Sequence, residues 1–236
     1  MSGKAIVLLS GGMDSTTLAY VMAQAGYDVI GLSLRYNQRH VKEVACAAEI
    51  MRGLQGAHHV IDLSAWGRQM KSVLTSDVGA IPEGHYAADN MSQTVVPLRN
   101  PLFLTIATSI GSSLGAAVVA AAVHAGDHAV YPDCRPEFTE AFTAMAEVAL
   151  DGMHKPRLRF PFVEKTKAEI VVMGHAAGVP WAETWSCYKG GAQHCGRCGT
   201  CVERAEAFAV AGVVDPTSYD DPTYWETVTD FWGDAE

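Results

Sequence analysis

The chain has 236 residues, of which 49% are hydrophobic and 18% are charged, so it can bury a full core and is not expected to be disordered. The formal net charge is −9, and residues 212–236 hold seven acidic residues and no Lys or Arg, so the nearly neutral remainder argues against nucleic acid as a partner. No apolar run is long enough to span a membrane and residues 5–9 do not resemble a secretory signal, so we expect a cytoplasmic protein.

Strand-like and helix-like segments alternate along the first part of the chain. Short apolar runs lie at residues 5–9, 28–34, 58–63 and 117–123, and patterns of helical period lie at residues 15–25 and 41–54. The alternation predicts an α/β fold with a doubly wound parallel sheet, in which ligands bind beyond the carboxyl ends of the strands. A capping box from Thr166 to Glu169 predicts a further helix, which Gly178 and Pro180 would end.

The composition changes after Trp181, where glycine, cysteine and aromatic residues replace the alternating pattern. We therefore expect an α/β domain at residues 1–180 and a small C-terminal segment at residues 181–236. Residues 216–232 are acidic and aromatic. We expect this tail to pack on the body or on a partner chain, and a homodimer is our hypothesis.

A glycine turn follows the first predicted strand and opens directly into a predicted helix. Its glycines allow close backbone approach to a phosphate, and the helix N-terminus favours negative charge. The turn lacks the Gly-Lys-Ser/Thr ending of a Walker loop and the spacing of a dinucleotide turn. The alternative is a turn capped by Asp14 or Ser15 without a ligand. The nucleotide site would comprise Leu9, Ser10, Gly11, Gly12, Met13, Asp14, Ser15, Thr16 and Thr17.

Four cysteines lie within fifteen positions near the end of the chain: Cys187, Cys195, Cys198 and Cys201. Disulfides are not expected in a reducing compartment. Two successive Cys-x-x-Cys steps can bend around one tetrahedral ion, and four thiolates favour zinc in a closed, structural site. An iron–sulfur centre is the competing interpretation.

Three polar segments follow predicted strands or precede a helix, at residues 35–40, 96–101 and 131–138. Arginine forks in the first two suit phosphate or carboxylate groups, although such segments are more often solvated loops. In the third, Asp133 could accept hydrogen bonds from a purine edge. It could equally cap a helix that begins near Arg135.

These motifs occur in the order seen in the 7-cyano-7-deazaguanine synthases, and the resemblance covers about residues 9–204. That family belongs to the PP-loop ATP pyrophosphatases. The resemblance implies an adenine nucleotide alpha hydrolase-like fold, ATP with Mg²⁺ and a structural Zn²⁺. It also implies conversion of 7-carboxy-7-deazaguanine and ammonia to the nitrile used for queuosine-type nucleosides, through adenylated intermediates.

By the same resemblance, Asp14 would orient the loop or its metal, while Arg39, Arg99 and Lys167 would stabilise phosphate charge. The residues expected to bind the deazaguanine are Arg35, Tyr36, Gln38, Asn100, Asp133 and Arg135. Residues 124–130 depart from the pattern of many members. A relative that stops at the amide or joins the acid to another amine therefore stays open, as do a tRNA thiolase and a nucleotide-binding zinc module without turnover.

Overall fold

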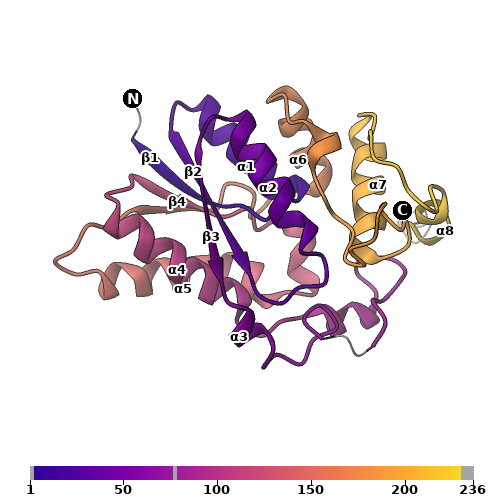
Figure 1. Ribbon diagram of the computed structural model, residues 1–236, viewed down its shortest axis with the longest axis horizontal. Coiled ribbons are helices and arrows are strands. Elements are labelled where there is room, and N and C mark those ends of the chain that lie inside the picture. Colours follow the sequence, from indigo (N-terminus) through magenta and orange to yellow (C-terminus); the bar gives the residue numbers. More distant parts are fainter. Residues whose placement is uncertain (1–2, 77–78, 230–236) are drawn as a thin grey trace.

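The computed structural model describes residues 3–76 and 79–229. In this part of the chain, five strands form one parallel sheet in the order β3-β2-β1-β4-β5. From β1 the chain first adds β2 and β3 on one side, and it later adds β4 and β5 on the other side (Figure 1). The sheet is therefore doubly wound, and the direction of winding reverses between β1 and β4. The strands are β1 Lys4–Leu8, β2 Asp28–Arg35, β3 Ala57–Asp62, β4 Val118–Ala120 and β5 Arg157–Arg159.

Alternating side chains of β1 build two core layers, one on each face of the sheet. Ala5 and Val7 are fully buried beneath α1 (Met13–Gln24), α2 (Lys42–Gly53) and α6 (Lys167–Ala176). Ile6 points to the opposite face, which α4 (Arg99–Ser113) and α5 (Pro136–Ala149) cover side by side (Figure 1). This arrangement follows from the two-residue period of a strand and confirms the predicted α/β class.

Strand positions agree with the apolar runs except at the two edges of the sheet. The run at residues 58–63 forms β3, but this strand is an edge strand with Val60 47% exposed, so it is not buried on both faces. The strand β5 was not predicted, because its sequence Arg-Leu-Arg contains only one apolar residue. It joins the sheet by pairing with β4.

The expected helix after Thr166 is confirmed as α6, including its capping box. Glu169 donates its backbone N–H to Thr166 Oγ1 at 3.2 Å, and Glu169 Oε2 accepts the backbone N–H of Thr166 at 2.8 Å.

The described residues contain no helix that is long and apolar enough to cross a membrane. The other short elements are α3 Ser64–Gly67 and 3₁₀ turns at Asp89–Thr94, Ala125–Ala129, Pro132–Cys134 and Trp181–Glu183.

The C-terminal segment packs directly on the α/β body. Its helix α7 (Gly199–Ala211) buries Phe208 against Met13 of α1 and Val171 of α6. The tail then returns through α8 (Tyr224–Thr229), and the Tyr219 ring lies 5.7 Å from the His194 ring. The described part of the tail therefore packs on the body, which was one of the two arrangements expected from the sequence. Trp232 lies outside the described residues. The domain boundary at residues 180 and 181 stays a prediction.

Candidate active site

A cavity opens at the carboxyl ends of β1 and β4, where the direction of sheet winding reverses. Its walls come from the loop after β1, the segment after β4, the first residues of α4 and α6, and the segment before α7. Ligands of doubly wound sheets bind at this type of position, because neighbouring loops diverge there to opposite faces. The topology therefore agrees with the sequence in placing the candidate site at the glycine turn.

The glycine turn is shaped by a close approach of α2. Gly11 has a φ of +93°, and a Cβ at this position would lie 2.1 Å from the backbone oxygen of Glu43. Gly12 is the N-cap of α1 and provides no side chain for the N–H groups of the first helical turn. The hydroxyls of Ser10 and Ser15 lie 3.0 Å apart beside them. The turn thus presents backbone and hydroxyl donors that suit a phosphate.

Six of the nine expected nucleotide-binding residues line the cavity: Leu9, Ser10, Gly12, Met13, Asp14 and Ser15. Gly11 lies behind the turn, where its carbonyl accepts the N–H of Trp185 at 2.9 Å. Thr16 and Thr17 are fully buried in α1, and Thr17 donates its hydroxyl to the Met13 carbonyl at 2.9 Å. These three residues therefore shape the turn from outside the cavity.

Lys167 lies at the centre of a charged cluster on one side of the cavity. Its Nζ is 2.5 Å from Glu203 Oε2 and 3.3 Å from Asp14 Oδ2. Burial opposes the charge of Lys167, but the nearby carboxylates outweigh burial and raise its pKa. Burial is the main cause of the raised pKa of Glu203, and the positive charge of Lys167 opposes this rise. Lys167 is thus held as a cation beside the phosphate loop.

Asp127 extends this cluster toward the end of β4. Its carboxylate accepts a hydrogen bond from the Tyr86 hydroxyl and lies 3.5 Å from His124 Nε2. Burial would raise the pKa of Asp127, but His124 and Lys167, together with the Tyr86 hydroxyl, bring it below its usual value. His124 also lies 3.7 Å from Asp14 Oδ2. A connected set of acidic and basic groups therefore spans the floor of the cavity.

Arg99 and a group of aromatic rings form another wall. Arg99 donates to the Tyr36 hydroxyl at 3.4 Å, and its guanidinium lies 5.6 Å from the centre of the Tyr131 ring. Phe103 packs edge-on against Tyr36 with ring centres 5.3 Å apart. Leu98, the residue before α4, adopts a φ of +56° and is 72% exposed. Such conformations are costly for leucine and concentrate at functional sites.

Gln38 and Asn100 also line this wall, and each forms a hydrogen bond with the backbone of a neighbouring segment. The Gln38 side-chain oxygen accepts the N–H of Tyr36 at 2.8 Å. Asp133 accepts the N–H of Asn100 at 3.0 Å, and Asn100 donates its side-chain amide to the Asp133 carbonyl at 3.1 Å. Asp133 therefore satisfies an N–H in the first turn of α4. It does not cap α5, whose N-cap Arg135 has no side-chain cap.

Besides the three turn residues already named, four further expected site residues do not line this cavity. Arg35 forms an ion pair with Asp62 on the neighbouring edge strand and is half exposed. Arg39 donates to the carbonyls of residues 76 and 79. Arg135 donates to the carbonyl of residue 128, and Asp133 is engaged at α4. Their roles in substrate binding stay predictions.

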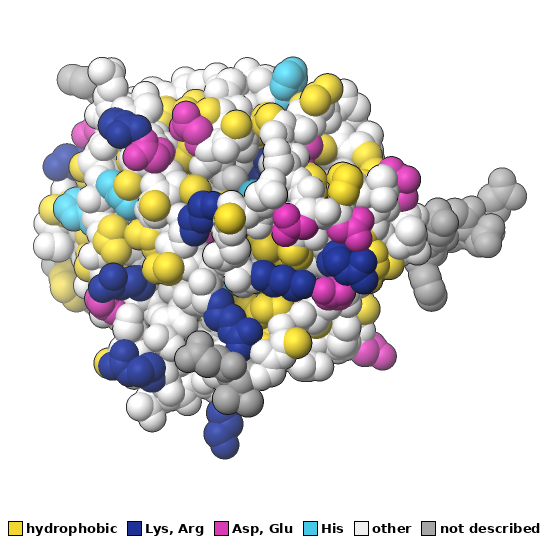
Figure 2. Space-filling view, turned by 45° about the vertical axis from the view of Figure 1, so that its right-hand side comes forward, with side chains coloured by type: hydrophobic (Ala, Val, Ile, Leu, Met, Phe, Trp, Pro, Cys, Tyr) yellow, Lys and Arg dark blue, Asp and Glu magenta, His cyan; other side chains and the backbone are white. Residues whose placement is uncertain are grey.

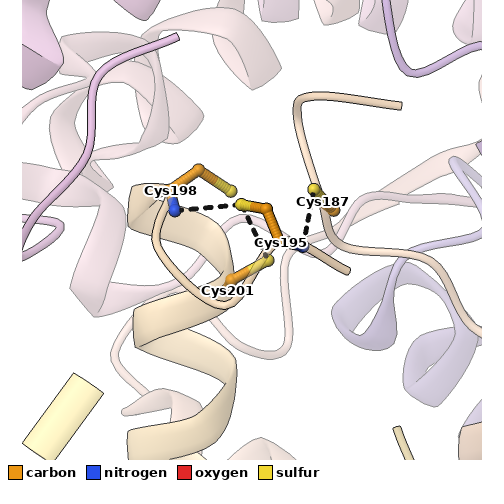
Figure 3. Close-up of side chains that lie close together, drawn as sticks. All are labelled: Cys187, Cys195, Cys198 and Cys201. Atoms are coloured by element: carbon orange, nitrogen blue, oxygen red, sulfur yellow. Dashed lines mark hydrogen bonds between the residues drawn. The ribbon is translucent and has the colours of Figure 1, made fainter. Parts of the chain in front are cut away.

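The four cysteines form a second site at the start of α7. Their sulfur atoms all lie within 4.8 Å of one another, with Cys187 reaching the cluster from a separate loop (Figure 3). The backbone N–H groups of Arg197 and Cys198 point to Cys195 Sγ at 3.4 and 3.3 Å. A tetrahedral ion with bonds of about 2.3 Å would place the sulfur atoms roughly 3.8 Å apart, so the donor set fits one metal with all positions filled.

Sequence reasoning missed several cavity residues, among them Glu43, Tyr86, Tyr188 and Glu203. Glu43 follows His40 by three residues, a spacing at which side chains of one helical turn meet, and this was the available signal. Glu203 lies two residues after the last cysteine, and nothing in its local sequence points to Lys167. Only the packing of α7 on α6 brings the two together.

A glycine phosphate turn at the switch point of a doubly wound parallel sheet, with a lysine beside it, defines a nucleotide-binding α/β protein of the PP-loop class. The family described as queuosine biosynthesis protein QueC matches residues 4–212, and the chain belongs to this family. A protein of Paracoccus denitrificans named 7-cyano-7-deazaguanine synthase is 51% identical over 222 residues, covering 94% of this chain and 95% of the relative.

A protein of Rhizobium meliloti with the same name is 52% identical over 227 residues, covering 96% of each chain. Among solved structures, a 4-thiouridine synthetase in complex with RNA and bound ATP aligns with a TM-score of 0.50 and 17% identity. The alignment covers 97% of this chain and 51% of the 4-thiouridine synthetase chain. This last similarity concerns the fold alone. The family membership agrees with the resemblance found from the motifs.

Proposed function

We propose that the protein is an ATP-dependent C–N ligase that converts 7-carboxy-7-deazaguanine and ammonia to 7-cyano-7-deazaguanine in queuosine biosynthesis. The observation that carries the proposal is the phosphate turn beside Lys167, in a chain whose relatives of 51% and 52% identity are named for this synthase. A carboxylate is a poor acyl donor, so nitrile formation from an acid requires activation. ATP supplies this activation as the acyl adenylate.

The reaction divides into two activations at one site. The substrate carboxylate attacks the α-phosphate, pyrophosphate leaves, and ammonia then displaces AMP to give the amide. A second attack by the amide oxygen on ATP gives an adenylated amide, from which loss of AMP and protons yields the nitrile. The protein provides no covalent nucleophile in this scheme, and it acts by positioning and by stabilising charge.

The charged floor of the cavity suits the phosphate chemistry. Ser10, Ser15 and the first turn of α1 would hold the phosphates, and Lys167 would stabilise the charge that develops on pyrophosphate. Asp14 Oδ1 is buried and has no hydrogen-bond partner among the described residues. This oxygen fits a role as a Mg²⁺ ligand, and Mg²⁺ held here would neutralise phosphate charge.

The aromatic wall suits a planar heterocycle. Tyr36, Tyr131 and Phe103 offer ring surfaces for a deazaguanine, and Arg99 lies among them to meet its carboxylate. On the face shown in Figure 2, several Lys and Arg side chains lie near one another, with acidic side chains beside some of them. The formal net charge of −9 favours a small molecule over nucleic acid as the substrate.

We further propose that the cysteine cluster holds one structural Zn²⁺, that the protein is cytoplasmic, and that it forms a homodimer. Zinc in this closed site would fix the start of α7 and hence Glu203 beside Lys167. Metal analysis tests the first point, with one zinc per chain expected and iron with sulfide contradicting it. Light scattering tests the dimer, which a clean monomer at micromolar concentration would exclude.

A product assay by mass spectrometry tests the main proposal. The protein is incubated with ATP, Mg²⁺, ammonium and 7-carboxy-7-deazaguanine, and AMP and the purine product are followed together. We expect the nitrile with AMP formed at each activation. Amide with AMP and no nitrile would instead identify a ligase that stops halfway, and absence of AMP would refute adenylation.

A further inference from the structure

Glu43 is a largely buried acid in the cavity to which the proposed chemistry assigns no role. It lies in the first turn of α2, with its side chain 13% exposed and lining the same cavity as the phosphate turn. The carboxylate oxygen Oε1 lies 4.0 Å from the position that a Cβ on Gly12 would occupy. Glu43 therefore borders the turn that we expect to hold the phosphates.

The surroundings of Glu43 leave its carboxylate without a cationic partner at short range. Within the described ranges, the salt bridges of Lys167 engage Asp14 and Glu203, while Glu43 meets only His40 Nε2, at 3.5 Å. Burial and the field of Arg99 lower the pKa of His40 to about 3, so this contact is not an ion pair at neutral pH. In such surroundings the neutral acid is favoured over the carboxylate unless a cation binds beside it.

The groups facing Glu43 connect it to both halves of the cavity. Arg99 of α4 and Tyr36 after β2 interact with it electrostatically from the aromatic wall, and Cys46 does so from α2 itself. Gly12 lies on its phosphate side. A substrate that stacks on the aromatic wall and is joined to an α-phosphate at the turn would have its acyl carbon between these two regions. Glu43 therefore lies beside the expected reaction centre.

We propose that Glu43 is a catalytic base that binds ammonium and takes one of its protons, so that ammonia forms next to the acyl adenylate. This inference rests on the proposed function. Ammonium is the main form of the nucleophile at neutral pH and has no lone pair with which to attack. A partnerless carboxylate in a cavity attracts this cation and can accept its proton, as general bases do.

The proton and bond changes balance as follows. The Glu43 carboxylate takes one proton from ammonium, and the nitrogen lone pair of ammonia then attacks the acyl carbon. The carbon–oxygen bond to AMP breaks, and AMP leaves with the electron pair. The nitrogen releases its surplus proton to water, and Glu43 returns its own proton to water. Burial raises the pKa of Glu43 to about 8, so in the empty cavity the acid is mainly protonated at neutral pH, and a bound ammonium ion favours the ionised form that accepts its proton.

Two partial reactions separate this role from nucleotide binding. Exchange of labelled pyrophosphate into ATP, with the deazaguanine acid present and ammonium absent, reports adenylation alone. Hydroxylamine is largely uncharged at pH 7, so it attacks the adenylate without prior loss of a proton. Both are measured on Glu43→Gln, which keeps the side-chain size, and on the control Glu49→Gln, an acid of the same helix that is 47% exposed.

For Glu43→Gln we expect pyrophosphate exchange within about threefold of the unaltered protein, and hydroxamate formation similarly preserved. Amide formation from ammonium should fall about 100-fold or more, the usual range for loss of a general base. Glu43→Asp should recover part of the rate, because it restores a carboxylate. Glu49→Gln should behave as the unaltered protein in all three assays.

The proposal would be overturned if Glu43→Gln lost exchange and amide formation in parallel, since Glu43 would then act in nucleotide binding or folding. Equal losses with ammonium and hydroxylamine would also exclude a base, as would unchanged amide formation. Absence of pyrophosphate exchange in the unaltered protein is a separate outcome. It would refute the proposed function itself, and the role of Glu43 with it.

Discussion

Arg204 provides a quantitative test of how the C-terminal segment is held on the body. Its side chain is fully buried, and its guanidinium donates to both carboxylate oxygens of Asp215 at 3.0–3.3 Å. It also donates to Thr184 Oγ1 at 2.7 Å and to the Trp181 carbonyl at 3.1 Å. One side chain thus ties α7 to the tail and to the segment that enters the cysteine cluster.

Arg204→Met keeps much of the side-chain volume but leaves Asp215 without its cationic partner. Removing one member of a buried ion pair costs about 3–5 kcal/mol, because the remaining charge is uncompensated. For a chain of 236 residues, each kcal/mol lowers the melting temperature by about 2–4 °C. We therefore expect the melting temperature to fall by roughly 6–20 °C.

Thermal and urea unfolding of the metal-loaded protein measure this change. Arg204→Met combined with Asp215→Asn should recover a large part of the loss, because the unpaired charge is then removed. Arg52→Met is the matched control, since Arg52 lies on the surface of α2 with its side chain 75% exposed and should matter little. If Arg204→Met were no more harmful than Arg52→Met, the buried network would not stabilise the fold as reasoned.

Three further predictions concern the active site and the cysteine cluster. Glu203→Gln removes the closest charged partner of Lys167 and should slow AMP release in single turnover roughly 10- to 100-fold. This range corresponds to loss of a charged hydrogen bond worth about 1.5–3 kcal/mol. A change below twofold would argue against this pairing. Cys201→Ser should abolish stoichiometric metal binding and lower stability, and retention of one metal per chain would show that the cluster is not the site. Gly11→Ala should destabilise the fold and weaken ATP binding, measured by calorimetry, because its φ of +93° and the Glu43 carbonyl 2.1 Å from the new Cβ both oppose a side chain.

The local motifs were predictable because each depends on residues close together in the chain. The turn at residues 10–16 follows a buried strand and opens a helix, and this order alone indicates an anion site. The capping box at Thr166 and Glu169 needs only three residues of spacing. The cysteine spacing likewise brings Cys195, Cys198 and Cys201 together through local turns, whereas Cys187 lies eight residues before the first of them and joins from a separate loop.

The tertiary structure decided which distant side chains meet. Arg35 was expected to follow the second strand but is its last residue, where it pairs with Asp62 on β3, and Asp133 satisfies the first turn of α4. Lys167 meets Glu203 because α6 and α7 pack side by side, and β5 enters the sheet because β4 offers an edge. Local periodicity reports only whether a residue faces a core. Sheet order and helix packing set which residues share the cavity, and these depend on contacts across the whole chain.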